Sequence, residues 1–226
     1  MSNKSVPETA GVSDRPRKTI VREYAEAIVI AIVLALVIRT FVIQAFKIPS
    51  GSMEDTLLIG DHLLVSKFSY GTHIPNEIPF FGNQLFPDFV LFQEIPKRGD
   101  IIVFKYPLDE SRDFIKRVIG LPGETLEVRR QKVYINEKPL NEPYVQHTVP
   151  YDPVSPVPNR DDYGPIRVPE GHVFVMGDNR ENSSDGRMWG FLDVSKIRGK
   201  AQRIYWSWNS DEFGIRWDRL GQSVYE

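Results

Sequence analysis

Two serines in the segment 48–53, IPSGSM, are the residues of this chain whose type and setting most suggest chemistry. Ser50 and Ser52 flank a glycine and follow a proline, which is also the composition of an ordinary polar turn. A serine hydroxyl becomes a nucleophile only when a nearby base takes its proton. The chain contains neither a G-x-S-x-G elbow nor an S-x-x-K motif, so the base has to come from elsewhere in the sequence.

A histidine or a lysine could supply that base. The histidines lie in unrelated strand and loop contexts, so a histidine-dependent hydrolase is an alternative without a supporting motif: His62, His73, His147 and His172. A lysine could serve if burial lowered its pKa from about 10.4 toward 7 or 8.

The segment 114–120, FIKRVIG, offers one lysine and one arginine in an apolar setting. In a strand, Lys116 shares a face with Phe114 and Val118, while Arg117 points to the other, equally apolar face. Either cation could therefore be desolvated, but only a lysine can give up its proton at a workable pH. The alternative is that both are surface cations on an edge strand.

A third candidate is the polar loop 177–187, GDNRENSSDGR. Its Asp, Asn and Ser side chains are of the kind that bond to nearby backbone, so an ordinary loop is one interpretation. In the functional interpretation, its hydroxyls orient an amine and an Asp/Arg pair holds the loop.

Short strands must position these residues. Runs of β-branched and aromatic residues bounded by Gly, Pro, Asn or Asp predict strands at 63–65, 101–104, 114–119, 133–135, 173–176 and 203–206. No long helical period follows residue 46. The sequence therefore predicts a mainly β domain.

An apolar run precedes the serine segment. Residues 27–46 form a stretch of 20 residues in which Arg39 is the one charge, and about 30 Å of helix is enough to cross a bilayer. The charge-free part, 27–38, is short enough to be a buried helix or the core of a cleavable signal. Arg39 and the lack of a small residue two positions before Ala45 favour a retained anchor.

Basic residues before this run predict a cytoplasmic N-terminus. The predicted division is a cytoplasmic tail at 1–22, a transmembrane anchor at 23–47 and an extracytoplasmic domain at 48–226, with an inserted lobe at about 127–169. The formal net charge of -2 argues against a nucleic-acid partner. Since the chain has no cysteine, an apolar core rather than disulfides has to stabilise this domain.

Together these segments resemble a family, the type I signal peptidases, which are membrane-bound serine/lysine endopeptidases that remove signal peptides from exported preproteins. The matching segments occur in the family's order: 48–53, 60–65, 98–104, 114–123 and 176–187. The ending 214–221, GIRWDRLG, is similar to that of Gram-negative members. The resemblance implies an antiparallel β catalytic domain with a small β-rich inserted lobe, at the outer face of the bacterial cytoplasmic membrane.

The resemblance also implies roles for individual residues. Ser52 would be the nucleophile and Lys116 the general base, with the Ser50 hydroxyl and the Ser52 backbone N–H as the oxyanion hole. Ser183 would orient the lysine. The remaining positions would support the site (Asp178, Asp185 and Arg187) or line the substrate pocket (Ile48, Met53, Leu57 and Ile115). The implied partners are secretory preproteins and the lipid bilayer, with no metal or cofactor.

The chain departs from the family pattern at a few positions: Glu54 and Asp55 after the Ser-Met pair, Glu124 and Gly186. These departures affect the residues that support the site and the preference of the site for substrate residues just after the cleavage point. The alternative function is a non-catalytic, membrane-anchored β module that binds extended polypeptides.

Overall fold

The structure is a computed structural model that describes residues 20–74, 89–91 and 93–225. It divides into two compact units, residues 1–37 and residues 38–226. Most of the predicted cytoplasmic tail lies outside the described residues.

Helix α1 (Ile20–Phe41) contains most of the N-terminal apolar run. Many of its large apolar side chains are exposed, among them Ile28, Val29, Ile30, Val33 and Leu34. Over the part of the chain that is described, no helix combines the length and apolarity needed to cross a membrane.

The predicted end of the helical segment is wrong. The helix stops at Phe41, and strand β1 (Ile43–Lys47) follows after a single residue. Ile43 pairs with Ser66 and Lys47 pairs with His62, so these residues belong to a sheet. The β-branched residues at this junction favour strand, and backbone pairing with a distant segment outweighs the continuity of the apolar run.

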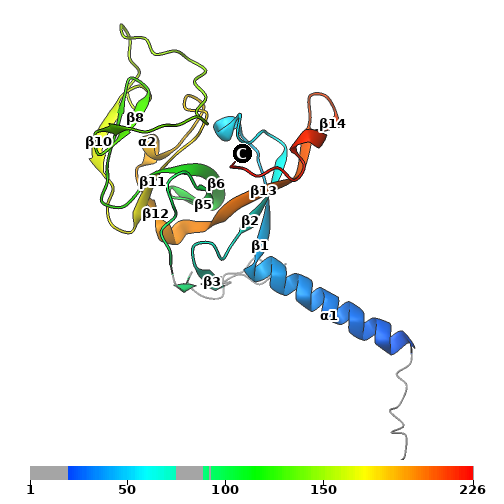
Figure 1. Cartoon of the computed structure of the whole chain (residues 1–226). Helices are drawn as coiled ribbons and strands as arrows, with labels where there is room; N and C mark the ends of the chain where they lie inside the picture. Colours follow the sequence, from blue (N-terminus) through cyan, green and yellow to red (C-terminus); the bar gives the residue numbers. More distant parts are fainter. Residues whose placement is uncertain (1–19, 75–88, 92, 226) are drawn as a thin grey trace, which may run out of the picture. The chain divides into compact units, whose positions relative to one another are not determined.

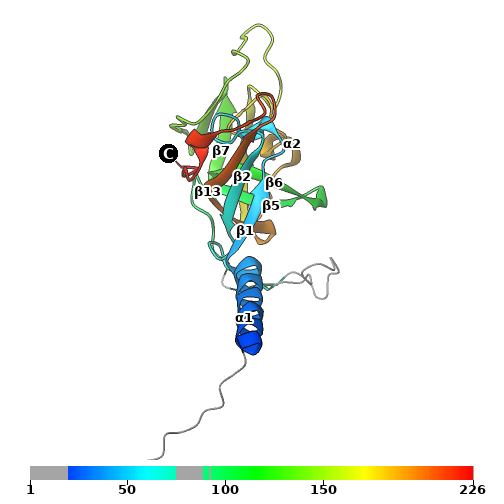
Figure 2. The same ribbon diagram turned by 90° about the vertical axis from the view of Figure 1, so that its right-hand side faces the viewer.

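The main sheet is antiparallel, and its strands lie in the order β1-β2-β13-β5-β6-β11-β12, with β14 added to the end of β13. Strand β13 therefore lies between β2 and β5 (Figure 1), and Figure 2 shows the same strands turned by 90°. The strands not yet given are β2 (Asp61–Ser66), β5 (Ile101–Tyr106), β6 (Asp109–Gly120), β11 (His172–Met176), β12 (Leu192–Asp193), β13 (Ile197–Asn209) and β14 (Gly214–Ile215). All six predicted strands are found within strands of the structure, and the mainly β prediction is confirmed.

A small second sheet, also antiparallel, has the order β10-β7-β8-β9. Its strands are β7 (Thr125–Arg129), β8 (Lys132–Ile135), β9 (Lys138–Pro139) and β10 (Tyr163–Arg167). This sheet falls almost entirely in the region predicted for an inserted lobe. The remaining elements are the pair β3 (Thr72–Ile74) and β4 (Phe89–Leu91), and the short helices η1 (Gly51–Met53), α2 (Gly186–Trp189), η2 (Val194–Lys196) and η3 (Trp217–Arg219).

Buried apolar clusters hold the site segments against these sheets. Met53 and Leu57, on either side of the turn after the serines, pack in one cluster with Ile48, Leu63 and Val103. A second cluster joins the two sheets through residues that include Ile119, Phe174 and Met176 of the main sheet and Leu126 and Val128 of the small one. Burying each such side chain stabilises the fold by about 1.5 to 3 kcal/mol. The backbone around Ser52 and before the loop 177–187 is thereby fixed.

Candidate active site

Ser52 lies in the short helix η1, which begins after the three residues that follow β1. The backbone on both sides is pinned, because the Ile48 N–H donates to the Asp61 carbonyl at 2.8 Å and the Leu57 N–H donates to the Met53 carbonyl at 2.7 Å. Ser52 is only 6% exposed. Ser50 takes the N-cap position with extended backbone, is exposed, and makes no capping bond with its side chain. The serine turn therefore has one buried and one open hydroxyl.

Strand β6 brings Lys116 to this turn. Its ammonium nitrogen Nζ lies 2.8 Å from Ser52 Oγ and 2.9 Å from the Ile115 carbonyl oxygen. Lys116 is 3% exposed. Burial lowers its pKa to about 8, against the opposing effect of the negative charges of Asp185 and Asp178. A lysine in this position can accept a proton near neutral pH.

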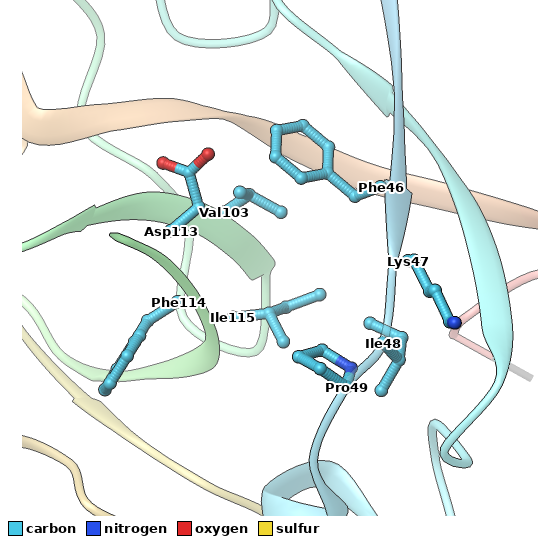
Figure 3. Close-up of a pocket in the computed structure, with 8 residues that line it drawn as sticks. All are labelled: Phe46, Lys47, Ile48, Pro49, Val103, Asp113, Phe114 and Ile115. Atoms are coloured by element: carbon cyan, nitrogen blue, oxygen red, sulfur yellow. The ribbon is translucent and has the colours of Figure 1, made fainter. Parts of the chain in front are cut away.

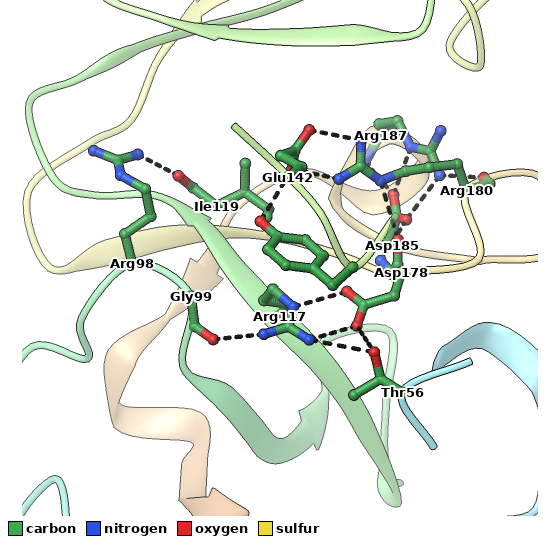
Figure 4. Close-up of polar contacts among 12 residues, drawn as sticks. Thr56, Arg98, Gly99, Arg117, Ile119, Glu142, Asp178, Arg180, Asp185 and Arg187 are labelled. Carbon is green, nitrogen blue, oxygen red and sulfur yellow. Dashed lines mark hydrogen bonds and ion pairs between the residues drawn. The ribbon is translucent and has the colours of Figure 1, made fainter. Parts of the chain in front are cut away.

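The neighbouring cation, Arg117, is also buried but has a full set of acidic and carbonyl partners (Figure 4). It binds Asp178 through two bonds, Nε to Oδ1 at 2.9 Å and Nη2 to Oδ2 at 2.6 Å, and it donates to the Gly99 carbonyl at 3.0 Å. Thr56 Oγ1 donates to the same carboxylate at 2.6 Å. Both cations are buried, so the interpretation of them as surface residues is wrong. Asp178 forms its ion pair with Arg117 and not with Lys116.

The loop 177–187 is held by a second buried ion pair. Arg187 donates from Nε and Nη2 to the two oxygens of Asp185, both at 2.9 Å, and the same carboxylate accepts the Gly177 N–H at 3.0 Å. Burial acts to raise the pKa of Asp185, but the hydrogen bonds and the charge of Arg187 outweigh it and hold that pKa below its usual value. Asp185 therefore stays ionised, next to Arg187.

This loop reaches the serine turn through its backbone, since the Asn179 N–H donates to the Ser52 carbonyl oxygen at 3.2 Å. Ser183, which is expected to orient the lysine, lies in the same loop. Its buried hydroxyl is close enough to Asp185 to contribute to the lowered pKa of that carboxyl, but it has no hydrogen-bonding partner of good geometry among the described residues, Lys116 included.

The described histidines are engaged elsewhere. His62 Nδ1 contacts the Tyr205 hydroxyl, His147 Nδ1 contacts Glu181, and His172 Nδ1 contacts the Glu170 carbonyl. The side chain of His73 lies outside the described residues. Of the described basic side chains, Lys116 is the one hydrogen-bonded to Ser52 Oγ.

A pocket lies beside the serine turn, between β1 and the strands β5 and β6 (Figure 3). Two predicted pocket residues, Ile48 and Ile115, line it. Met53 and Leu57 do not, because both are fully buried in the core. The residues that sequence reasoning missed are Phe46, Lys47, Pro49, Val103, Asp113 and Phe114. Several of them directly adjoin the serine segment or Lys116, and that adjacency was the available signal.

Two departures from the family pattern have local explanations. Glu124 accepts the Leu121 N–H at 2.8 Å and forms an ion pair with Arg98, so it closes the turn after β6. At Gly186, a Cβ atom would lie 2.8 Å from the ring of Phe174. A larger residue there would need the ring to move.

Gly177 is a point where the site tolerates no side chain. A Cβ atom there would lie 2.3 Å from Ser183 Oγ and 2.5 Å from the Ser52 carbonyl oxygen. Gly177→Ala is expected to displace the serine turn and to lower kcat about tenfold to a hundredfold, because overpacking typically costs about 1 to 3 kcal/mol. Steady-state kinetics on a cleavable substrate would measure the loss.

Gly214→Ala is the matched control for Gly177→Ala. The nearest atom to its new Cβ would be the Glu212 carbonyl oxygen at 3.8 Å, an ordinary contact. Equal kinetics for both variants would contradict the tight approach at Gly177.

Comparisons with known proteins identify the family of this chain. A family profile described as "Signal peptidase, peptidase S26" matches residues 21–206. A probable signal peptidase I-2 of Synechocystis is 36% identical over 91% of this chain and 83% of its own length. Signal peptidase I of Pseudomonas fluorescens is 32% identical over 90% of this chain and 79% of its own.

A solved structure of a signal peptidase I from Enterococcus faecalis is 36% identical, covers 47% of this chain and 97% of its own, and has a TM-score of 0.39. With a family match over most of its length and relatives of this identity, the chain belongs to the signal peptidases of peptidase family S26, serine enzymes that remove signal peptides.

Proposed function

We propose that this chain cleaves preproteins with Ser52 as nucleophile and Lys116 as general base. The observation that carries the proposal is the hydrogen bond of 2.8 Å between Lys116 Nζ and Ser52 Oγ, made by a buried lysine. A nucleophile within hydrogen-bonding reach of a base with a matched pKa is the arrangement that covalent hydrolysis requires. A non-catalytic binding module would need neither the contact nor the desolvated amine.

The reaction would proceed in two halves. Neutral Lys116 takes the proton from Ser52 Oγ as that oxygen attacks the scissile carbonyl carbon, and it then gives the proton to the departing amine. The acyl chain remains as an ester on Ser52. Lys116 next takes a proton from a water molecule, the resulting hydroxide attacks the ester carbonyl, and Ser52 Oγ recovers the proton as it leaves.

The negative charge on the tetrahedral intermediate needs hydrogen-bond donors. The Ser50 hydroxyl and the Ser52 backbone N–H are proposed for this role, because the first N–H groups of a helix lack acceptors within it. The exposure of Ser50 and the absence of a capping bond from its side chain support an available hydroxyl. Loss of one such donor typically lowers kcat by about 10² to 10³.

The remaining site residues are proposed as supports and as pocket walls. Asp178, through Arg117, and the pair Asp185 and Arg187 would hold the loop against the serine turn. Ser183 is proposed to orient the Lys116 amine. Ile48 and Ile115 would contact small side chains of the preprotein before the cleavage point.

The N-terminal helix is proposed to attach the chain to the bacterial cytoplasmic membrane, with the catalytic domain on the outer side. The exposed apolar side chains of α1 and the basic residues that precede it support this placement. Attachment would raise the effective concentration of the enzyme toward preproteins that emerge from the same membrane.

A purified, detergent-solubilised chain is expected to cut a preprotein once, after a small residue, with kcat/KM rising with pH. The base is the neutral amine, so activity is low below a pKa of about 8 and levels off above it. Between pH 6 and pH 9 the rise should be about 90-fold. Initial rates across this range, with sequencing of the new N-terminus, would test the proposal.

Substrate binding should be measured over the same pH range as a control, since a change in affinity would alter kcat/KM for another reason. A profile with its midpoint near 10, or one that is flat, would contradict Lys116 as the base. Binding without any cut would favour the binding-module alternative.

A further inference from the structure

The serine turn ends in an acidic side chain that the proposed mechanism does not use. Glu54 follows Met53 directly, caps η1 and is partly exposed. Its Oε2 accepts a hydrogen bond from Asn179 Nδ2 at 3.3 Å. Among residues 20–74, 89–91 and 93–225, no cation forms an ion pair with this carboxylate, whereas Arg117, Arg180 and Arg187 all bind other acids.

The carboxylate lies over the bare backbone next to the nucleophile. A Cβ atom placed on Gly51 would be 2.9 Å from Glu54 Oε2 and 3.3 Å from Asn182 Nδ2. Gly51 directly precedes Ser52 in the sequence. The negative charge of Glu54 therefore lies beside the residue next to the nucleophile.

This acidic group does not line the pocket. The pocket is lined from β1, the residues just after it, β5 and β6, and it includes neither Glu54 nor any residue of the loop 177–187. Glu54 instead contacts that loop through Asn179. With the acyl side of a polypeptide in the pocket and the scissile carbonyl at Ser52, the leaving side lies outside the pocket. Glu54, which lies beside Gly51, is an acidic group outside the pocket that this leaving side can approach.

We propose that Glu54 is a specificity-determining residue for the leaving side, favouring a cationic side chain in the first two positions after the scissile bond and disfavouring an acidic one. The inference rests on the proposed function, because it takes Ser52 as the nucleophile and the pocket as the acyl-side subsite. A partly exposed carboxylate attracts a lysine ammonium and repels a carboxylate, and each effect is modest in contact with water.

The test uses two preproteins that are identical except for Lys or Glu at the second position after the cut. The wild-type chain is expected to prefer the Lys substrate by about threefold to tenfold in kcat/KM at low salt, since attraction and repulsion both contribute. Glu54→Gln should bring this ratio close to one, and Glu54→Lys should bring it below one. The ratio, rather than the absolute rate, is the measured quantity because Glu54 also contacts Asn179.

Asp55→Asn is the matched control, because it removes the adjacent exposed carboxylate, and it should leave the preference intact. The wild-type preference should also fall as salt is raised. An unchanged ratio in Glu54→Gln, or equal loss of the preference in Asp55→Asn, would overturn the inference while cleavage at Ser52 continued. Failure of the proposed function would appear differently, as cleavage that survives Ser52→Ala.

Discussion

Lys116→Met is expected to lower kcat by about 10⁴-fold to 10⁶-fold, the range seen when a nucleophile or its base is removed from a serine protease. Methionine has a similar length and suits a buried site, so the change removes the proton acceptor 2.8 Å from Ser52 Oγ with little change in volume. Single-turnover kinetics on a preprotein would measure the loss of the chemical step.

Two further variants sharpen this prediction. Lys116→Arg should not restore activity, because an arginine cannot give up its proton at workable pH. Ser52→Ala should be about as inactive as Lys116→Met, and the double variant should be no worse than either, since the two groups act as one unit. Substantial activity in Lys116→Met, with a folded protein by circular dichroism, would remove Lys116 from the mechanism.

Asp185→Ala is expected to lower the free energy of unfolding by about 3 to 5 kcal/mol, because it leaves a buried guanidinium without its counter-charge. Arg187 is 4% exposed and Asp185 is fully buried, so water cannot replace the carboxylate. The variant also loses the acceptor of the Gly177 N–H, which should loosen the loop beside Ser52. Urea unfolding followed by tryptophan fluorescence would give the difference.

Glu127→Ala is the control for this measurement, because Glu127 pairs with Arg129 at the surface and such pairs contribute at most about 1 kcal/mol. Adding Arg187→Met to Asp185→Ala should recover part of the lost stability, since the unpaired buried charge is then gone. It should not recover activity. If Asp185→Ala lowered the free energy of unfolding by at most about 1 kcal/mol, as expected for a surface pair, that result would contradict the buried ion pair.

The contrast between Lys116 and Arg117 marks the limit of what the sequence could predict about the site. Alternation and apolar neighbours predicted the strand and showed that either cation could be desolvated. In the structure both are buried, and their partners distinguish them. Arg117 has Asp178, from a loop 61 residues away, while Lys116 has a hydroxyl and a carbonyl. Such long-range pairing leaves no trace in the local pattern of residues.

The junction after Phe41 has the same explanation. Residues 41–43, FVI, are apolar on both sides of the boundary between helix α1 and strand β1, so composition and hydropathy do not mark it. Residues 43–47 become a strand because residues 62–66 offer backbone partners. The positions of Met53 and Leu57 inside the core depend in the same way on contacts with Leu63 and Val103. Local patterns predicted the elements, and tertiary contacts decided their ends and their faces.

The central place of β13 in the main sheet sets an order of folding. This strand, near the end of the chain, pairs with β2 on one side and β5 on the other. Until Ile197–Asn209 has been synthesised, both neighbours have an unpaired edge and the sheet is incomplete. Pairings so distant in sequence form slowly. The main sheet is therefore kept open while the chain is growing, and it closes only after β13, which lies near the end of the sequence, is available to pair with both neighbours.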